Sequence, residues 1–527
     1  MLKMNKENFL YSIALAVVIF ALRFAFFADE KTDFSSDTGH YAIASEFYSI
    51  QDYAPHLPGY FLYVKLIKVV SFLTGSPQSA MKWLSLLFSV AGSLFLFRIA
   101  RNYTGEKASF LLALLIMTNP FVWFFGCNNE IYTFDLFFSA AIVFAGLNNK
   151  WIYSTPPILA LGMGIRLSSA VLLLPVVVYL WYNHNKKQGI YWARFFEFTS
   201  LAVVLLLMWL IPMFRSAGGI GKYIALYDTH YPFIPSGVLY NLSNFIGYAW
   251  YILLPFASIA AFAGYMLFRG KPISWKEFKE NNSKELFTAI YWLAPALIVF
   301  TFFNYQKGYF LLAAGALFLL YILWYKQGLL KNSIVIAVIL IQSALFFAMP
   351  YSEPPDELNF TAQARSFGRE EAWAHRLVSG FSMGAQRIAA YDGYYSDIHK
   401  GIKETKELIK VKKKYFYMFD PSCLVFARGF QALMPSQTFC VLNNYDMRTY
   451  FSYNEYELRK TTDPYYMIKN AIIISRKSFY EKYLKGIAAP IKEYDTYVFL
   501  DGNEINGIRL LQIYTDLYDE REDKEKE

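Results

Sequence analysis

Charged residues are scarce in this chain of 527 residues. Asp, Glu, Lys and Arg make up 17% of it, whereas hydrophobic residues make up 56%. A soluble protein of this length would be close to a quarter charged, so the composition excludes an ordinary soluble protein. Apolar runs of roughly 20 residues recur from Tyr11 to Met349 and stop there. This pattern predicts a polytopic helical membrane protein followed by a tail of a different kind.

Cysteine is also rare, and the three residues present are too few for a disulfide framework. Cys423 and Cys440 both fall in the tail and could pair if that tail is extracytoplasmic. The chain shows no internal repeats or low-complexity linkers. Its first apolar run has no small-residue cleavage site, which predicts a retained helix and not a removed signal peptide.

The net charge of +9 does not indicate a nucleic-acid partner. The basic residues lie mostly in short loops between apolar runs, where they orient membrane helices. Five such loops contain Lys or Arg: "RNYTGEK", "NNK", "NHNKKQGIYWAR", "RGKPISWKEFKENNSKE" and "YKQGLLKN". This asymmetry predicts a multi-pass protein of the plasma (inner) membrane, with these loops and the N-terminus in the cytoplasm and the tail outside.

The apolar runs predict about eleven transmembrane helices. They lie near 9–28, 80–99, 108–125, 131–148, 153–165, 168–182, 197–214, 244–268, 286–303, 310–325 and 332–349. The runs 153–165 and 168–182 are short and meet at Gly162, Gly164 and Arg166, so we interpret them as two helices joined by a wet turn. The alternative is one long tilted helix, which would invert the sidedness of everything downstream.

The stretch 57–74 is too charged to span a membrane comfortably. Lys65 and Lys68 lie one turn apart in it, and Pro58 suits a position near a helix start. We therefore expect a helix that lies in the membrane interface, with the lysines reaching the lipid head groups.

The tail contains short runs that favour strands. They are "KYFYMF", "TFCVLN", "NAIIIS", "TYVFLD" and "IRLLQIY", with helix-like segments such as 397–413 between them. The predicted organisation is a transmembrane domain at 1–350, a small α/β domain outside the membrane at 351–515, and a charged disordered end at 516–527.

Four ionisable residues fall on the predicted outer side, each at a helix mouth: Asp37, Glu130, Arg166 and Lys307. Ionisable groups at membrane depth are costly and mark functional sites by default. Each one alone is also consistent with a helix cap or a side chain that reaches for water. Together they suit a phosphate-bearing lipid substrate, because cations stabilise a phosphate leaving group and a carboxylate accepts the proton of an attacking group.

The order and spacing of several stretches over residues 1–350 resemble the GT-C superfamily of polytopic glycosyltransferases. The stretches are "SDTGHYAIASEFY", "HLPGYFLYVKL", "NPFVWFFGCNNEIYTFDLFFSA", "LGMGIRLSSAVLLLPVVVYL" and "YQKGYFLLAAGALFLL". In layout the chain is similar to protein O-mannosyltransferases and to the bacterial lipid A aminoarabinose transferases. The resemblance implies a polyprenyl- or dolichyl-phosphate sugar as donor, and a protein, lipid or glycan as acceptor.

The resemblance also implies roles for individual residues. Asp37 matches the catalytic acid of the first outer loop, and Glu130 matches the acid of the second. We assign donor-phosphate binding to Arg166, Lys307, Tyr309 and Lys65. We assign contacts with the acceptor or the sugar to His40, Tyr41, His56 and Asp135.

Two departures from the superfamily pattern bear on metal binding. Thr38 follows Asp37 where many relatives have a second acid, and the second loop contains "NNE" without an Asp-x-Asp pair. We therefore assign no metal and no other cofactor. The expected activity is an inverting sugar transfer at the outer face of the membrane. The main alternative is a lipid or glycan transporter or flippase, although the polar residues gather on one side and no matching halves are visible.

Overall fold

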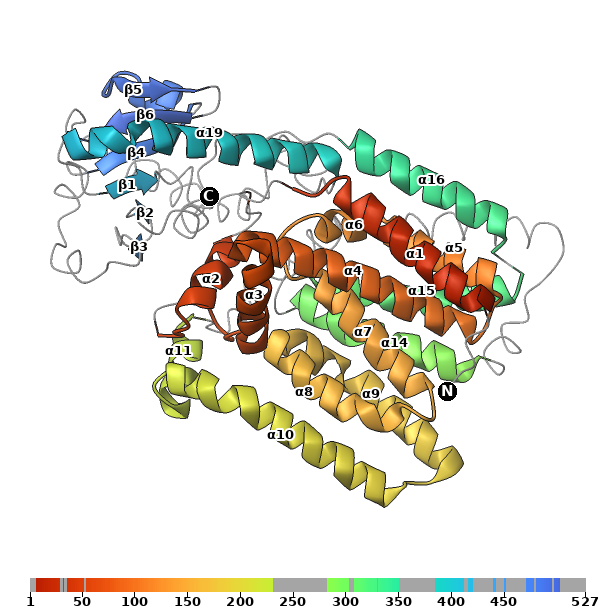
Figure 1. Cartoon of the computed structure of the whole chain (residues 1–527). Helices are drawn as coiled ribbons and strands as arrows, with labels where there is room; N and C mark the ends of the chain where they lie inside the picture. The colour runs from red at the N-terminus through yellow and green to blue at the C-terminus, as the bar shows by residue number, and fades with distance from the viewer. Residues whose placement is uncertain are drawn as a thin grey trace, which may run out of the picture. The chain divides into compact units, whose positions relative to one another are not determined.

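The computed structural model of the chain contains a helical bundle and a small sheet (Figure 1). It describes residues 6–28, 32, 36–51, 54–230, 282–302, 308–328, 330–349, 384–411, 416–419, 439–441, 450–451, 471–477, 480–494 and 497–502. Several predictions fall outside these residues: the helix at 244–268, Lys307, Cys423, the strand-like run "IRLLQIY" and the charged end.

The chain divides into two compact units. The first contains 1–28, 44–352 and 374–388, and the second contains 29–43, 353–373 and 389–527. Part of the predicted first outer loop therefore belongs to the same unit as the tail.

The first unit is helical. Its described helices are α1 (Lys6–Phe24), α3 (Phe61–Thr74), α4 (Pro77–Arg101), α5 (Glu106–Met117), α6 (Pro120–Gly126), α7 (Thr133–Leu147), α8 (Thr155–Ile165), α9 (Leu167–Gln188), α10 (Trp192–Ser216), α11 (Ile220–His230), α14 (Ser283–Phe302), α15 (Gly308–Lys326) and α16 (Asn332–Ala348). Helix α2 (Ser36–Glu46) crosses the division between the units. Helix α4 packs against α1, α3, α5 and α7, and α15 packs against α7 and α14.

Among the described residues, four helices are long and apolar enough to cross a membrane. They are α1, α4, the stretch Leu167–Lys186 of α9, and α10, and the pair α5–α6 would make a fifth if it is one broken span. Further apolar helices such as α7 and α16 are shorter. Together these helices indicate a multi-pass membrane protein.

The structure corrects the predicted helix at 108–125, which is two helices. Helices α5 and α6 meet at an angle of 77°. The Asn119 side chain accepts a hydrogen bond from the Phe121 amide at 3.1 Å, and Pro120 occupies the first turn of α6. An Asn cap followed by Pro starts a new helix, so the apolar run changes direction there.

The predicted interfacial helix is α3, which begins after Tyr60. Lys65 is exposed on it, with its ammonium 5.7 Å from the Tyr48 ring centroid and 5.3 Å from that of Phe61. Phe72 and Leu73, near its end, are more than four-fifths exposed. A helix with an exposed lysine and an exposed apolar end suits the membrane interface.

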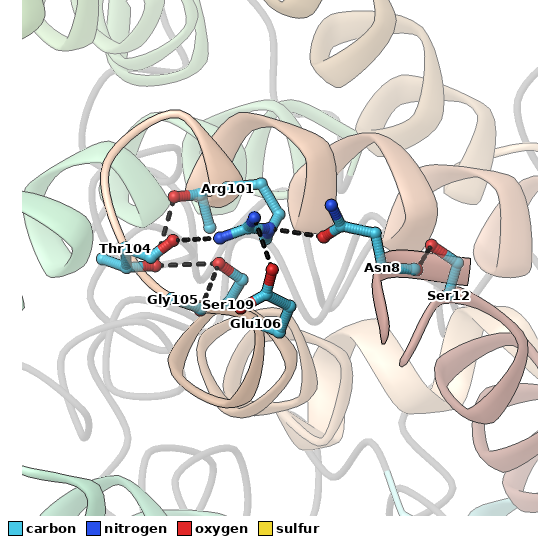
Figure 2. A network of polar contacts seen from close by, with 8 residues as sticks. Asn8, Ser12, Arg101, Thr104, Gly105, Glu106 and Ser109 are labelled. Atoms are coloured by element: carbon cyan, nitrogen blue, oxygen red, sulfur yellow. Dashed lines mark hydrogen bonds and ion pairs between the residues drawn. The ribbon is translucent and has the colours of Figure 1, made fainter. Parts of the chain in front are cut away.

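A polar network closes the end of the bundle at the predicted cytoplasmic loop "RNYTGEK" (Figure 2). The Arg101 guanidinium pairs with Glu106 at 2.6 Å and donates to Asn8 Oδ1 at 2.7 Å and to the Thr104 carbonyl at 2.6 Å. One basic residue of this loop therefore joins α1, α4 and α5, in addition to any role in orienting the protein.

The second unit contains a mixed six-stranded sheet. Its strands are β1 (Phe416–Phe419), β2 (Phe439–Val441), β3 (Tyr450–Phe451), β4 (Ala471–Arg476), β5 (Pro490–Glu493) and β6 (Tyr497–Asp501), in the order β3-β2-β1-β4-β6-β5. Strand β1 pairs in parallel with β2 and β4, and the other pairings are antiparallel. Four of the five predicted strand runs are confirmed as β1, β2, β4 and β6.

Helix α19 (Ala385–Val411) covers the sheet of the second unit. Its Tyr395 and Ile398 share an apolar core with Tyr417 and Phe499. The hydroxyl of Thr32 donates to the carboxylate of Asp392 on α19. A side-chain hydrogen bond thus joins the segment 29–43 to the tail within this unit.

Candidate active site

Arg166 lies at the break between α8 and α9. Its backbone is extended, with φ −150° and ψ 97°, so one helix ends and the next begins at this residue. The side chain is 2% exposed, and its Nε lies 3.3 Å from Oδ2 of Asp135. The two short predicted helices are thus confirmed as separate helices, and the charge between them is held inside the unit.

Asp135 is the buried partner of that cation. It lies in the first turn of α7 and is completely buried, and its Oδ1 accepts a hydrogen bond from the Ser169 hydroxyl on α9. Removing a carboxylate and a guanidinium from water costs several kcal/mol for each ion, so such ions persist only in well-paired geometry. The pair therefore fixes α7 and α9 against each other.

Tyrosines surround the guanidinium. Its carbon lies 4.8 Å from the centroid of the Tyr132 ring, within the range of a cation–π contact. Tyr60, just before α3, and Tyr309, in the first turn of α15, interact electrostatically with the same guanidinium. Groups from the α3, α7 and α15 regions therefore converge on Arg166.

Gly308 brings the start of α15 against the ion pair. A Cβ at this position would overlap Oδ2 of Asp135 and would lie 2.9 Å from Cδ1 of Tyr132 and 3.0 Å from Nη2 of Arg166. Only glycine fits a backbone that approaches so closely. The preceding residue, Lys307, is outside the described residues. The start of α15, at Gly308, lies against the Asp135–Arg166 pair.

Glu130 lies in the turn between α6 and α7 and is almost completely buried. The backbone holds it firmly, because its amide donates to Oδ1 of Asn128 at 3.0 Å and its carbonyl accepts from the Ser85 hydroxyl at 2.8 Å. Tyr63 on α3 interacts electrostatically with both Glu130 and Arg166. The second-loop acid therefore belongs to the same region as the ion pair.

The other predicted site residues are placed differently. The His56 ring lies 5.0 Å from that of Tyr60, while Lys65 is exposed over two aromatic rings of the interface. Asp37, His40 and Tyr41 lie in the part of α2 that belongs to the second unit, where Asp37 is half-buried in the first turn and Tyr41 is buried.

Two further buried cations were not singled out from the sequence. Arg23 on α1 and Lys82 on α4 are both completely buried. Lys82 precedes by one turn Ser85, whose hydroxyl holds the Glu130 carbonyl. The signal that identified Arg166, a single charge within an apolar run, would also have found these two residues.

The described residues contain no group of three or more His, Cys, Asp or Glu side chains that could hold a metal ion. Asp135, an acid of the site in the first unit, contacts the guanidinium of Arg166 and the hydroxyl of Ser169.

The family described as dolichyl-phosphate-mannose-protein mannosyltransferase matches residues 59–213. Two crystal structures of ArnT from Cupriavidus metallidurans resemble the chain, one in the apo state with a TM-score of 0.58 and one bound to undecaprenyl phosphate with a TM-score of 0.56. Each is 14% identical to this chain in sequence, and each match covers 93% of this chain and 97% of the ArnT chain. No curated protein matches significantly by sequence. The predicted resemblance to the GT-C superfamily is confirmed, and the fold is that of this superfamily.

Proposed function

We propose that this protein, which has the GT-C fold, is a membrane glycosyltransferase that moves a sugar from a polyprenyl-phosphate donor to an acceptor at the outer face of the membrane. The observation that carries the proposal is the buried Arg166–Asp135 pair at the ends of α7 and α9, against the start of α15. Both residues and Glu130 lie inside the stretch that matches the mannosyltransferase family. The similar fold of a protein bound to undecaprenyl phosphate supports the donor class.

The donor phosphate is assigned to the tyrosine-lined surroundings of Arg166. Asp135 contacts the guanidinium through Nε, and a guanidinium carries five N–H donors in a planar fork. Guanidinium and phosphate match in bidentate geometry. The start of α15 adds the partial positive charge of a helix N-terminus, and Lys307 immediately precedes it in the chain.

Asp135 acts in this scheme as the residue that orients Arg166. Without it, the guanidinium would be a buried charge with the freedom to take other rotamers. The carboxylate fixes the direction of the side chain and is itself fixed by Ser169. The pair has no net charge, so binding the negatively charged phosphodiester of the donor depends on the helix start and on Lys307 as well as on Arg166.

The transfer itself is a displacement at the anomeric carbon of the sugar. An acceptor oxygen forms the new bond on the side opposite the phosphate, the bond between the anomeric carbon and the phosphate oxygen breaks, and the lipid phosphate leaves with the electron pair. The acceptor proton passes to a carboxylate, and we assign this role to Asp37 because its loop resembles the first outer loop of the superfamily. The configuration is inverted, and the leaving phosphate needs charge stabilisation more than protonation. Glu130 is assigned to the sugar-bearing side of the site.

The experiment is sugar transfer by the purified full-length protein in liposomes that contain a radiolabelled polyprenyl-phosphate sugar and a total acceptor extract. Asp37→Asn and Glu130→Gln should each abolish transfer, while Arg215→Met, a change on an exposed side chain at the end of α10, should leave it unchanged. An Asp37→Asn protein that is well folded and fully active removes Asp37 from catalysis. Label that crosses the bilayer while still attached to its lipid supports a flippase instead.

A further inference from the structure

Arg23 is a cation inside the first membrane helix. It is the last residue but one of α1, and its side chain is completely buried. An arginine at membrane depth costs about 2.5–3.5 kcal/mol on insertion scales unless it has partners or water. The transfer chemistry above does not use this charge, so its contacts must show its role.

The contacts of Arg23 lie at the break between α5 and α6. Its Nη2 donates to the carbonyl oxygen of Met117, the last residue of α5, and its Nε donates to the Ser89 hydroxyl on α4 at 3.2 Å. The last carbonyls of a helix lack partners within the helix, and positive charge is favourable there. The guanidinium also lies 5.5 Å from the centroid of the Trp123 ring on α6.

Two further hydrogen bonds join the same end of α1 to α6 and to the residue after it. The Trp123 indole donates to the Leu22 carbonyl at 3.0 Å, and the Ala28 amide donates to the Cys127 carbonyl at 3.1 Å. The end of α1 is thus attached to the short helix α6 at two points, at Trp123 near the middle of α6 and at Cys127 just after its last residue. The 77° bend between α5 and α6 is therefore supported from α1.

Gly126 allows this close approach. A Cβ on Gly126 would overlap Nε and Cδ of Arg23 and would lie 3.1 Å from the Ser89 hydroxyl. Glycine is required here by space and not by backbone conformation. Any larger residue must displace the guanidinium or the last turn of α6.

Glu130 follows Gly126 by four residues, and hydrogen bonds restrain the turn between them. The Cys127 carbonyl is tied to Ala28, and Glu130 is tied through its amide to Asn128 and through its carbonyl to Ser85. A shift at Gly126 is therefore expected to move the turn that carries Glu130, because the turn is hydrogen-bonded at Cys127, at Asn128 and at Glu130.

We propose that Arg23 is a positioning residue that fixes the α5–α6 bend and thereby sets the position of Glu130. The inference rests on the proposed transferase function for its kinetic consequence. The structural part of the proposal is that Arg23 and Gly126 together hold the turn 127–130 in place. This part stands independently of that function.

The test uses Cys127 as a native reporter, because its side chain is completely buried. The full-length protein is treated in detergent with a membrane-permeant maleimide, and alkylation of Cys127 is followed by mass spectrometry of its peptide. The variants are Gly126→Ala, which keeps every hydrogen-bonding group, Arg23→Met, which removes the charge, and Arg23→Lys, which keeps it. Gly221→Ala is the matched control, since a Cβ at this helical position meets nothing within 4 Å.

We expect Cys127 to be protected in the wild type and in Gly221→Ala, and to react at least about tenfold faster in Gly126→Ala and Arg23→Met. The kcat of sugar transfer should fall roughly 10- to 100-fold in these two variants, with the KM for the donor within about threefold of wild type, and Arg23→Lys should recover part of the loss. Protected Cys127 with wild-type kcat in folded Gly126→Ala overturns the proposal. If the wild type transfers no sugar, the proposed function fails while alkylation still decides the structural part.

Discussion

The contact between Gly308 and the buried ion pair gives a prediction in which two opposing energies can be compared. Gly308 is the first residue of α15. Alanine stabilises a helix interior by about 0.5–1 kcal/mol relative to glycine, and less at an end. If propensity alone mattered, Gly308→Ala would be neutral or stabilising.

The surroundings of Gly308 reverse that expectation. The added methyl group would overlap a carboxylate oxygen of Asp135 and crowd the Tyr132 ring and the Arg166 guanidinium. Overpacking a tight interior costs typically about 1–3 kcal/mol, and displacement of a buried ion pair adds to that cost. The steric term is therefore larger, and we expect a net destabilisation of about 1–3 kcal/mol together with loss of sugar transfer.

The assay combines thermal unfolding of the purified protein in detergent with sugar transfer in liposomes. The matched control is Gly393→Ala on α19, where a Cβ meets nothing within 4 Å and helix propensity alone should act. If Gly308→Ala unfolds at or above the wild-type temperature and transfers sugar normally, α15 does not begin against the Asp135–Arg166 pair. The described arrangement of the site would then be wrong.

Three further predictions follow from single contacts. Asp135→Asn leaves the guanidinium of Arg166 without its carboxylate, which costs about 3–5 kcal/mol for a buried pair, so we expect strongly reduced thermal stability, and a wild-type melting temperature would contradict the pairing. Thr32→Val should lower stability by about 1 kcal/mol through the lost hydrogen bond to Asp392, whereas Thr32→Ser should not, and equal melting temperatures would exclude that bond. Hydrogen bonds from Lys492 and from Tyr494 lower the pKa of Glu404. The stabilising effect of this carboxylate is therefore present above its unfolded pKa of about 4.3 and is lost as the pH falls through the lower folded value. Glu404→Gln should flatten that acid dependence in unfolding curves taken between about pH 5 and pH 3, and unchanged curves would show that Glu404 contributes nothing to it.

Much of the fold follows from patterns that the sequence displays locally. The apolar runs place the helices, and the lone charge among glycines at Arg166 correctly marks a break between α8 and α9. The break after α5 was missed because hydropathy is continuous through it, although the Asn119–Pro120 pair is a helix-start signal. The short apolar and aromatic runs of the tail predict the sheet, but not the short edge strands β3 and β5, which lack a pattern of their own.

The candidate site depends on contacts between distant segments, and these the sequence does not display. The sequence predicts that Asp135 contacts the acceptor or the sugar, and it does not display the partners that the structure adds, Arg166 and Ser169, which come from another pair of helices. The need for glycine at position 308 follows only when α15 is placed against α7. Arg23 shows the same lone-charge signal as Arg166, yet its role at the α5–α6 bend depends on where α1 ends in space.

The central claim is that a sugar leaves its lipid phosphate and joins an acceptor at this protein. The most direct measurement follows a radiolabelled polyprenyl-phosphate sugar in liposomes that contain the purified protein and a total acceptor extract. The account predicts label in a product that no longer carries polyprenyl phosphate, release of an equal amount of polyprenyl phosphate, and loss of both in Asp37→Asn and Glu130→Gln. Label that stays on its lipid, whether or not it crosses the bilayer, would contradict the account.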